Sequence, residues 1–422
     1  MMNPAWVAAI IFIVTYILIV TERVHRTVSA MLGGVAMILL RVLTQAEAFR
    51  AIDWNVIFLL VGMMVIANIL RETGLFQWLA VQAVRLGRGQ PVRILLVLCV
   101  VTALSSAFLD NVTIVVLVVP VTLFVTEQLR LNPLPFLIAE ILACNIGGTA
   151  TLIGDPPNIL IGSAAGIDFT TFLAHMGPIS LLILLSFLGL AWLMFRKELQ
   201  ARPVHAADLS ALEAAELITN RPLLRKGVIV MGVVIFGFLI HGALHLESAT
   251  IALAGATILL IWARTNPHHA IREVEWTTLF FFAGLFIVVE GLVQTGIIRA
   301  MAQAALHLVD GNVRLASMVL LWMSALISGV VDNIPYTVTM IPLVESLGQA
   351  MPLEPLWWSL ALGACLGGNA TLVGASANVV VASLAERSGH PIRFWTFLAY
   401  GVLTTFVSLL LATGYIWLRY LR

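Results

Sequence analysis

The sequence predicts an all-α polytopic membrane protein built from two inverted repeats, and three observations support this fold class. Hydrophobic residues make up 60% of the 422-residue chain and charged residues only 11%, which is too little polar surface for a soluble globule. The charged residues fall between apolar runs long enough for a helix to cross a bilayer. A polar motif in the first half also recurs in the second.

The repeat is clearest around two Asp-Asn pairs. SSAFLDNVTIVVLVVP, from residue 105, aligns with ISGVVDNIPYTVTMIP, from residue 327, which places Asp110 on Asp332 and Asn111 on Asn333. The same offset holds for more than 60 residues. After a slip of two residues, GGTATLIGDPPN from Gly147 matches GGNATLVGASAN from Gly367. A duplicated polar, glycine-rich break in so apolar a chain is the first place to expect a transport site.

The pattern of apolar runs and breaks assigns the elements in order. We predict about ten transmembrane helices, eight of them placed by uninterrupted apolar runs near residues 5–22, 27–43, 54–71, 177–196, 226–242, 247–263, 276–293 and 395–418. Two segments with a polar tip, 92–129 and 313–347, are expected to be re-entrant hairpins, and 136–165 and 357–384 to be helices broken by Gly, Thr and Pro. Residues 1–198 and 223–422 would then form the two repeats, joined by a linker at 199–222.

The distribution of basic residues supports the hairpins. With hairpins, each half crosses the membrane an odd number of times, so the second half is inserted upside down. One face then carries 17 of the 23 lysines and arginines and the other face 6, which satisfies the positive-inside rule. We therefore expect a multi-pass protein of the cell's inner (cytoplasmic) membrane with both termini outside and a cytoplasmic linker. The net charge of +1 and the composition give no sign of nucleic-acid binding, a cofactor or a metal site.

Acidic residues at membrane depth are candidates for ion coupling, because an unpaired carboxylate there costs several kcal/mol. The candidate proton- or ion-coupling residues are Asp110, Glu140, Asp155, Asp332 and Glu290. Two alternatives stay open. Asp110 and Asp332 also fit the N-cap of the second hairpin arm, a role that is compatible with an ion site. Glu140 could instead hydrogen-bond to a neighbouring helix.

The remaining candidates would bind the solute from the hairpin tips and the broken helices. Glycines let the backbone approach a solute closely, Thr and Asn supply neutral donors and acceptors, and unwound backbone can coordinate ions. The alternative is a kink whose small residues serve only helix packing. The predicted substrate-binding residues are Asp110, Asn111, Asn145, Gly147, Gly148, Thr149, Thr151, Asn158, Asp332, Asn333, Gly367, Gly368, Asn369, Thr371, Ser376 and Asn378. Cys99, Cys144 and Cys365 are expected to be buried free thiols.

Four motifs carry a resemblance to a known family: SAFLDNVTIVVLVVPVT, NIGGTATLIGDPPN, SALISGVVDNIPYTVTMIP and GACLGGNATLVGASANV. Nearly the whole chain resembles the ion transporter superfamily, in the ArsB/NhaD branch that includes arsenite efflux pumps, Na⁺/H⁺ antiporters and P-protein-like members. The resemblance implies two inverted repeats, a homodimer on a scaffold domain, and a mobile transport domain. Where dicarboxylate-carrying relatives show Ser-Asn-Thr at the tips, this chain has Asp110-Asn111-Val112 and Asp332-Asn333-Ile334. An aspartate at each tip disfavours a dianion and tolerates a cation or a neutral oxyacid.

From these residues the sequence predicts a secondary active transporter that exports arsenite or antimonite against protons by an elevator-type movement. A Na⁺/H⁺ antiporter is the first alternative, and an anion or carboxylate permease or channel another. The expected partners are a small inorganic oxyacid or ion, protons or Na⁺, and membrane lipid, with a soluble ATPase partner left open. An intramembrane aspartyl protease is disfavoured, because Leu109 and Val331 stand where that class has Gly before the catalytic Asp.

Overall fold

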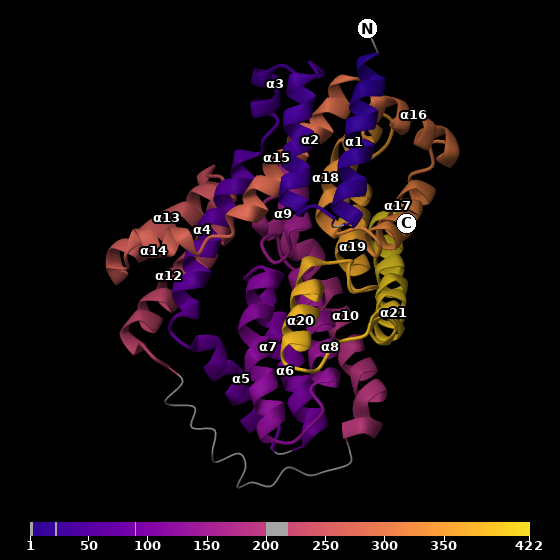
Figure 1. Cartoon of the computed structure of the whole chain (residues 1–422). Helices are drawn as coiled ribbons and strands as arrows, with labels where there is room; N and C mark the ends of the chain where they lie inside the picture. Colours follow the sequence, from indigo (N-terminus) through magenta and orange to yellow (C-terminus); the bar gives the residue numbers. More distant parts are fainter. Residues whose placement is uncertain (1–2, 22, 89, 200–217) are drawn as a thin grey trace.

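A computed structural model describes residues 3–21, 23–88, 90–199 and 218–422 as an all-helical molecule (Figure 1). The prediction of an all-α membrane protein is confirmed. The helices of the first half are α1 (Pro4–Thr21), α2 (Arg26–Leu39), α3 (Gln45–Arg50), α4 (Trp54–Arg71), α5 (Leu75–Leu86), α6 (Pro91–Ser106), α7 (Asn111–Gln128), α8 (Leu134–Gly148), α9 (Pro156–Ala165) and α10 (Phe169–Leu199). Those of the second half are α12 (Arg221–Leu244), α13 (Ser248–Ala263), α14 (Pro267–Arg272), α15 (Trp276–Gln294), α16 (Ile297–Val309), α17 (Val313–Ser328), α18 (Asn333–Leu347), α19 (Glu354–Gly367), α20 (Ser376–Arg387) and α21 (Phe394–Tyr420).

The two halves share one order of elements. Each begins with two helices and a short third, and continues with a long helix, an amphipathic helix, a hairpin, a broken helix and a long final helix. Figure 1 places α5 at one end of the molecule and its counterpart α16 at the other. That the second repeat is inverted relative to the first stays a prediction.

Helices of one half pack closely on helices of the other through matched glycines. A Cβ added to Gly62 of α4 would lie 2.6 Å from the carbonyl carbon of Ala252 in α13. A Cβ added to Gly284 of α15 would lie 2.5 Å from the carbonyl carbon of Ala30 in α2. Gly62 and Gly284 are 222 positions apart, and so are Ala30 and Ala252, so the two contacts pair equivalent residues of the repeat. Small residues therefore let the backbones of the two halves touch at two equivalent crossings.

Seven of the described helices are long and apolar enough to cross a membrane alone, or eight spans if the bent pair α16 and α17 counts as one. Helices α2, α6, α8 and α13 are apolar but have only 14 to 16 residues. The second arm of the first hairpin, α7, has 18 residues and is itself long enough to cross. The broken helices are interrupted after Gly148 and after Gly367.

Most of the predicted linker, with the residues from 200 to 217, lies outside the described residues. Beyond it, the backbone N–H of Thr219 donates to the carbonyl of Thr73, 3.1 Å away. All three cysteines are buried and free, as expected.

Candidate functional site

The two hairpin tips place their aspartates at helix N-termini. Asp110 caps α7, where its Oδ1 accepts a hydrogen bond from the backbone N–H of Thr113 at 3.0 Å. Asp332 caps α18, where its Oδ1 accepts from the N–H of Ile334 at 3.1 Å. Both aspartates remain partly exposed. Each tip therefore combines a carboxylate with the positive end of a helix.

The second tip carries a cation that sequence reasoning missed. The Arg26 guanidinium, at the start of α2, lies 3.3 Å from Asp332 Oδ2 and donates to the Ser376 hydroxyl at 2.6 Å. Ser376, the first residue of α20, donates in turn to Asp332 Oδ2 at 2.7 Å. Arg26 also lies 5.5 Å from the ring centre of Phe281. No feature of the sequence distinguishes Arg26 from Arg23, because both stand in the same polar turn between two apolar runs.

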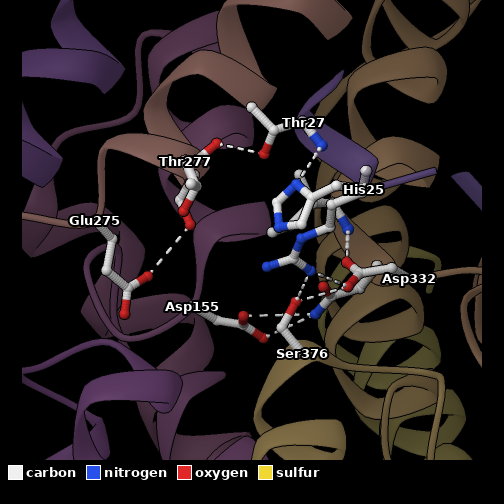
Figure 2. A network of polar contacts seen from close by, with 11 residues as sticks. His25, Thr27, Asp155, Glu275, Thr277, Asp332 and Ser376 are labelled. Atoms are coloured by element: carbon white, nitrogen blue, oxygen red, sulfur yellow. Dashed lines mark hydrogen bonds and ion pairs between the residues drawn. The ribbon is translucent and has the colours of Figure 1, made fainter. Parts of the chain in front are cut away.

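A carboxylate from the first repeat meets the second tip. Asn333, the residue after Asp332, donates its side-chain amide to the two oxygens of Asp155 at 3.3 and 3.5 Å. Asp155 precedes α9 and is only 2% exposed, and α9 packs against α18 of the other repeat. Figure 2 shows Asp155 facing Ser376 and Asp332 across this junction. The structure thus brings together residues that the sequence separates by 177 positions or more.

The first tip has an acidic neighbour instead of a basic one. Glu275 stands in the turn before α15 and is labelled in Figure 2 on the side of Asp155 away from Asp332. Burial, together with the charge of Asp110, raises the pKa of Glu275 to about 7. Thr278 donates to Glu275 at 3.2 Å. Glu275 was not among the acids selected from the sequence, and it directly precedes the apolar run of α15.

The hydroxyls of the broken helices tie each break to its own hairpin. Thr151 donates to the carbonyl of Ala107, and Thr371 donates to the carbonyl of Gly329 at 2.6 Å. Ala107 and Gly329 are equivalent positions just before the two tips. Hairpin tip and broken helix therefore form one connected unit in each repeat.

The two asparagines that follow the breaks close the loops before them. The Asn158 amide donates to the carbonyls of Gly148 and Thr151 at 3.1 and 2.9 Å. The Asn378 amide donates to the carbonyl of Gly368 at 2.7 Å and to that of Thr371 at 2.8 Å. The backbone carbonyls of the breaks, which were expected to bind a solute, thus accept hydrogen bonds from the protein itself.

The side chains of Asn158 and Asn378 also form hydrogen bonds with residues of the other repeat. Cys365 of α19 donates to Asn158 Oδ1 at 3.2 Å, and Asn145 of α8 donates to Asn378 Oδ1 at 2.9 Å. Asn145 donates to Asn369 Oδ1 at the same distance, while its own Oδ1 is buried without a partner. We conclude that the four central amides hold the two breaks together.

The predicted glycines and the first-tip asparagine are engaged in packing. A Cβ on Gly147 would lie 2.1 Å from the carbonyl oxygen of Ala103, and one on Gly367 2.5 Å from that of Ala325. Gly148 packs against Asn111, whose Oδ1 accepts a hydrogen bond from Ser106. Just after α8, the Thr149 hydroxyl donates back to the Asn145 carbonyl at 2.8 Å. These contacts fit the packing interpretation that the sequence left open.

Two predicted acids lie apart from this cluster. Glu140 is 1% exposed and accepts a hydrogen bond from Thr122 at 2.7 Å, while its second oxygen has no partner. Glu290 accepts from Gln294 at 2.6 Å near the far end of α15. The structure connects neither residue to the tips through hydrogen bonds or ion pairs.

Comparison with known proteins gives one family match and several close relatives. Residues 16–363 match the family described as "Citrate transporter". An uncharacterized transporter of Mycobacterium bovis is 45% identical, covering 98% of both chains, and a 46 kDa membrane protein of Mycobacterium leprae is 44% identical, covering 98% of this chain and 99% of the relative. The P protein of Sus scrofa is 36% identical over 97% of this chain and 59% of its own length.

The fold has a solved counterpart. The YdaH transporter of Alcanivorax borkumensis, whose structure is reported to have an unusual topology, superposes with a TM-score of 0.61. The match covers 99% of this chain and 98% of that one at 16% sequence identity, so it speaks for the fold alone.

Proposed function

Because the chain belongs to the citrate transporter family and is therefore a membrane transporter, we propose that it is a secondary active transporter that exchanges protons for a small cation at the tip carboxylates. The observation that carries this proposal is the contact of Asp155 with Asn333. This contact joins the buried carboxylate of Asp155, in the first repeat, to the residue that follows the tip aspartate of the second repeat. Inverted-repeat transporters bind their ions at such a junction between repeats.

The charge balance favours a cation over the other solutes. Three aspartates and Glu275 stand against two guanidinium groups, which are already engaged: Arg26 pairs with Asp332, and Arg71 pairs with Glu273. The Asp155 carboxylate accepts a hydrogen bond from the neutral amide of Asn333. A carboxylate in such a setting is stable only when a proton or a metal cation neutralises it, and these two can replace one another. A citrate-like anion would meet repulsion here, even though the family is described by citrate.

Arsenite or antimonite efflux is the second candidate. Arg26, Ser376 and Asp332 form a partly exposed trio of donors and acceptors that a neutral trihydroxy acid could contact. The amides of the broken helices, which the sequence analysis assigned to this solute, are used within the protein. This is why we rank cation exchange above arsenite.

An elevator-type movement fits the same arrangement. The hairpins and broken helices pack on one another across the repeats, α7 on α20 and α18 on α9. The pair between Arg26 and Asp332 joins this unit to α2, which packs on α15. In our proposal the unit moves relative to the helices α1, α2, α4, α12, α13 and α15. The protein would act as a homodimer in the cytoplasmic membrane with both termini outside, in accordance with the distribution of basic residues.

The test is proton exchange in everted membrane vesicles of a host deficient in sodium export. Addition of Na⁺ or Li⁺ should collapse a preformed proton gradient, and Asp155→Asn should abolish this response. Asp168→Asn is the matched control, since Asp168 stands before α10 and accepts from the N–H of Thr171 at 2.6 Å and from the Thr170 hydroxyl at 2.7 Å. Arsenite resistance without cation-dependent proton movement would instead select the second candidate. No response to cations, arsenite or citrate would reject the proposal.

A further inference from the structure

The cation at the second tip comes from a part of the chain outside the hairpins and broken helices. Arg26 is the first residue of α2, which packs on α15 and α1. Its guanidinium nevertheless lies 3.3 Å from Asp332 at the tip and donates to Ser376 of α20 at 2.6 Å. The side chains of Arg26 and Asp332 are 31% and 16% exposed, so the pair is not sealed inside the protein.

The groups around the Arg26 guanidinium are those that would bind a free ligand of the same kind. Ser376 accepts from Arg26 and donates to Asp332 Oδ2 at 2.7 Å, and Figure 2 shows Ser376 and Asp332 lying together. The ring centre of Phe281 is 5.5 Å from the guanidinium carbon. A carboxylate, a hydroxyl oxygen and an aromatic ring together suit a planar cation with several N–H donors. The second tip is thus already occupied by a cation that belongs to the protein.

The first tip shows that a tip aspartate does not need such a partner. In the first repeat, the position equivalent to Ser376 is held by Pro156, which has no hydroxyl. Conversely, the position equivalent to Arg26 in the second repeat is held by Ser248, so no arginine is duplicated for the first tip. Asp110 nevertheless caps α7 in the same manner as its counterpart caps α18. The arginine and the hydroxyl are therefore a feature of the second tip alone and not a requirement of the hairpin fold.

We propose that Arg26 is a tethered competitor of the transported cation, and that Asp332 and Ser376, beside the Phe281 ring, bind guanidinium-class cations. This inference rests on the proposed function, because it takes Asp332 as a ligand of the transported cation. That cation must displace Arg26, whereas an empty tip keeps its charge compensated by Arg26. Since Arg26 belongs to α2, the empty unit of hairpins and broken helices is also held to α2 until a cation releases it. Movement of the empty unit, which would break the coupling of the exchange, is thereby suppressed.

Isothermal titration of the purified protein with methylguanidinium at constant ionic strength tests the proposal. Arg26→Ala removes the tethered guanidinium and should bind one methylguanidinium per chain. The native protein should bind it at least about tenfold more weakly, because a tethered competitor acts at an effective concentration in the millimolar range. Arg26→Lys keeps a tethered cation and should resemble the native protein. Tetramethylammonium carries the same charge without an N–H donor and should bind to none of them.

The matched control is Arg23→Ala, because Arg23 stands in the same turn as Arg26, carries the same charge and is exposed. This variant should titrate like the native protein. Asp332→Asn, added to Arg26→Ala, should remove the binding and so assign the methylguanidinium to the second tip. Arg26→Gln is a second variant without the tethered charge, and circular dichroism of each variant separates loss of binding from loss of fold.

Three results would overturn the inference: no saturable binding to folded Arg26→Ala and Arg26→Gln, equally tight binding by the native protein, or binding that survives Asp332→Asn. The proposed function fails separately. Methylguanidinium binding to Arg26→Ala, without cation-dependent proton exchange by the native protein, would reject the proposed function and leave the guanidinium site standing. Exchange by the native protein, without methylguanidinium binding to either variant, would reject the tethered competitor alone.

Discussion

The close crossings between the halves predict how alanine at two glycines changes stability. In Gly62→Ala, the new Cβ would lie 2.6 Å from the carbonyl carbon and 2.8 Å from the carbonyl oxygen of Ala252. Carbon atoms in favourable contact stand about 3.5–4.0 Å apart, so α4 and α13 must separate by roughly 1 Å. Overpacking of this kind costs about 1–3 kcal/mol. Gly284→Ala, which meets Ala30 at 2.5 Å, should cost a similar amount.

The matched control is Gly232→Ala in α12, where the added Cβ meets nothing within 4 Å. It retains the gain in helix propensity of roughly 1 kcal/mol without the clash. From the usual unfolding entropy per residue, each test variant should melt roughly 1–3 °C below this control in a detergent thermal-shift assay. The effects should add in the double variant, because the two crossings are separate. Melting of both single variants at or above the control temperature would refute the matched packing.

Three further outcomes follow from the site. Arg26→Gln removes from Asp332 a partly exposed ion pair worth about 1–2 kcal/mol, so the KM for the coupling cation should fall roughly 5- to 30-fold. The control Arg23→Gln should leave the KM unchanged. An unchanged KM in Arg26→Gln would contradict this prediction. Glu275 is protonated below its raised pKa of about 7 and charged above it, so the transport rate of the native protein should show a step between about pH 6 and 8. Glu275→Gln, which is neutral at every pH, should lose that step, and a surviving step would assign it to another group. Glu140→Gln keeps an acceptor for Thr122 and should retain gradient-driven transport in vesicles, whereas loss of coupling at an unchanged melting temperature would return Glu140 to the proton path.

The sequence predicted the helical class and the broken elements well, because both depend on local patterns. Apolar runs of spanning length and glycine-rich breaks appear in one stretch of chain, and the repeat shows each of them twice. The N-cap role left open for Asp110 and Asp332 is also local, and the structure has it at both tips.

Partnerships across the repeats could not be predicted in the same way. Arg26 reaches Asp332 from 306 positions away, and no feature distinguishes it from Arg23 in sequence. Polar residues at the breaks pointed to a binding site, but Asn158 and Asn378 are bound within the protein. A sequence gives the donors and acceptors, whereas only the packed structure shows which of them remain free.

The hydrogen bonds that link the breaks of the two repeats have a consequence for biosynthesis. The side-chain oxygen of Asn158 accepts a hydrogen bond from Cys365, which the ribosome synthesises more than two hundred residues after Asn158. The leading half can insert into the membrane, but its break cannot reach its final state until the trailing half arrives. A nascent protein halted near the middle should therefore expose an incomplete loop to quality-control proteases, and separate expression of the trailing half should rescue it.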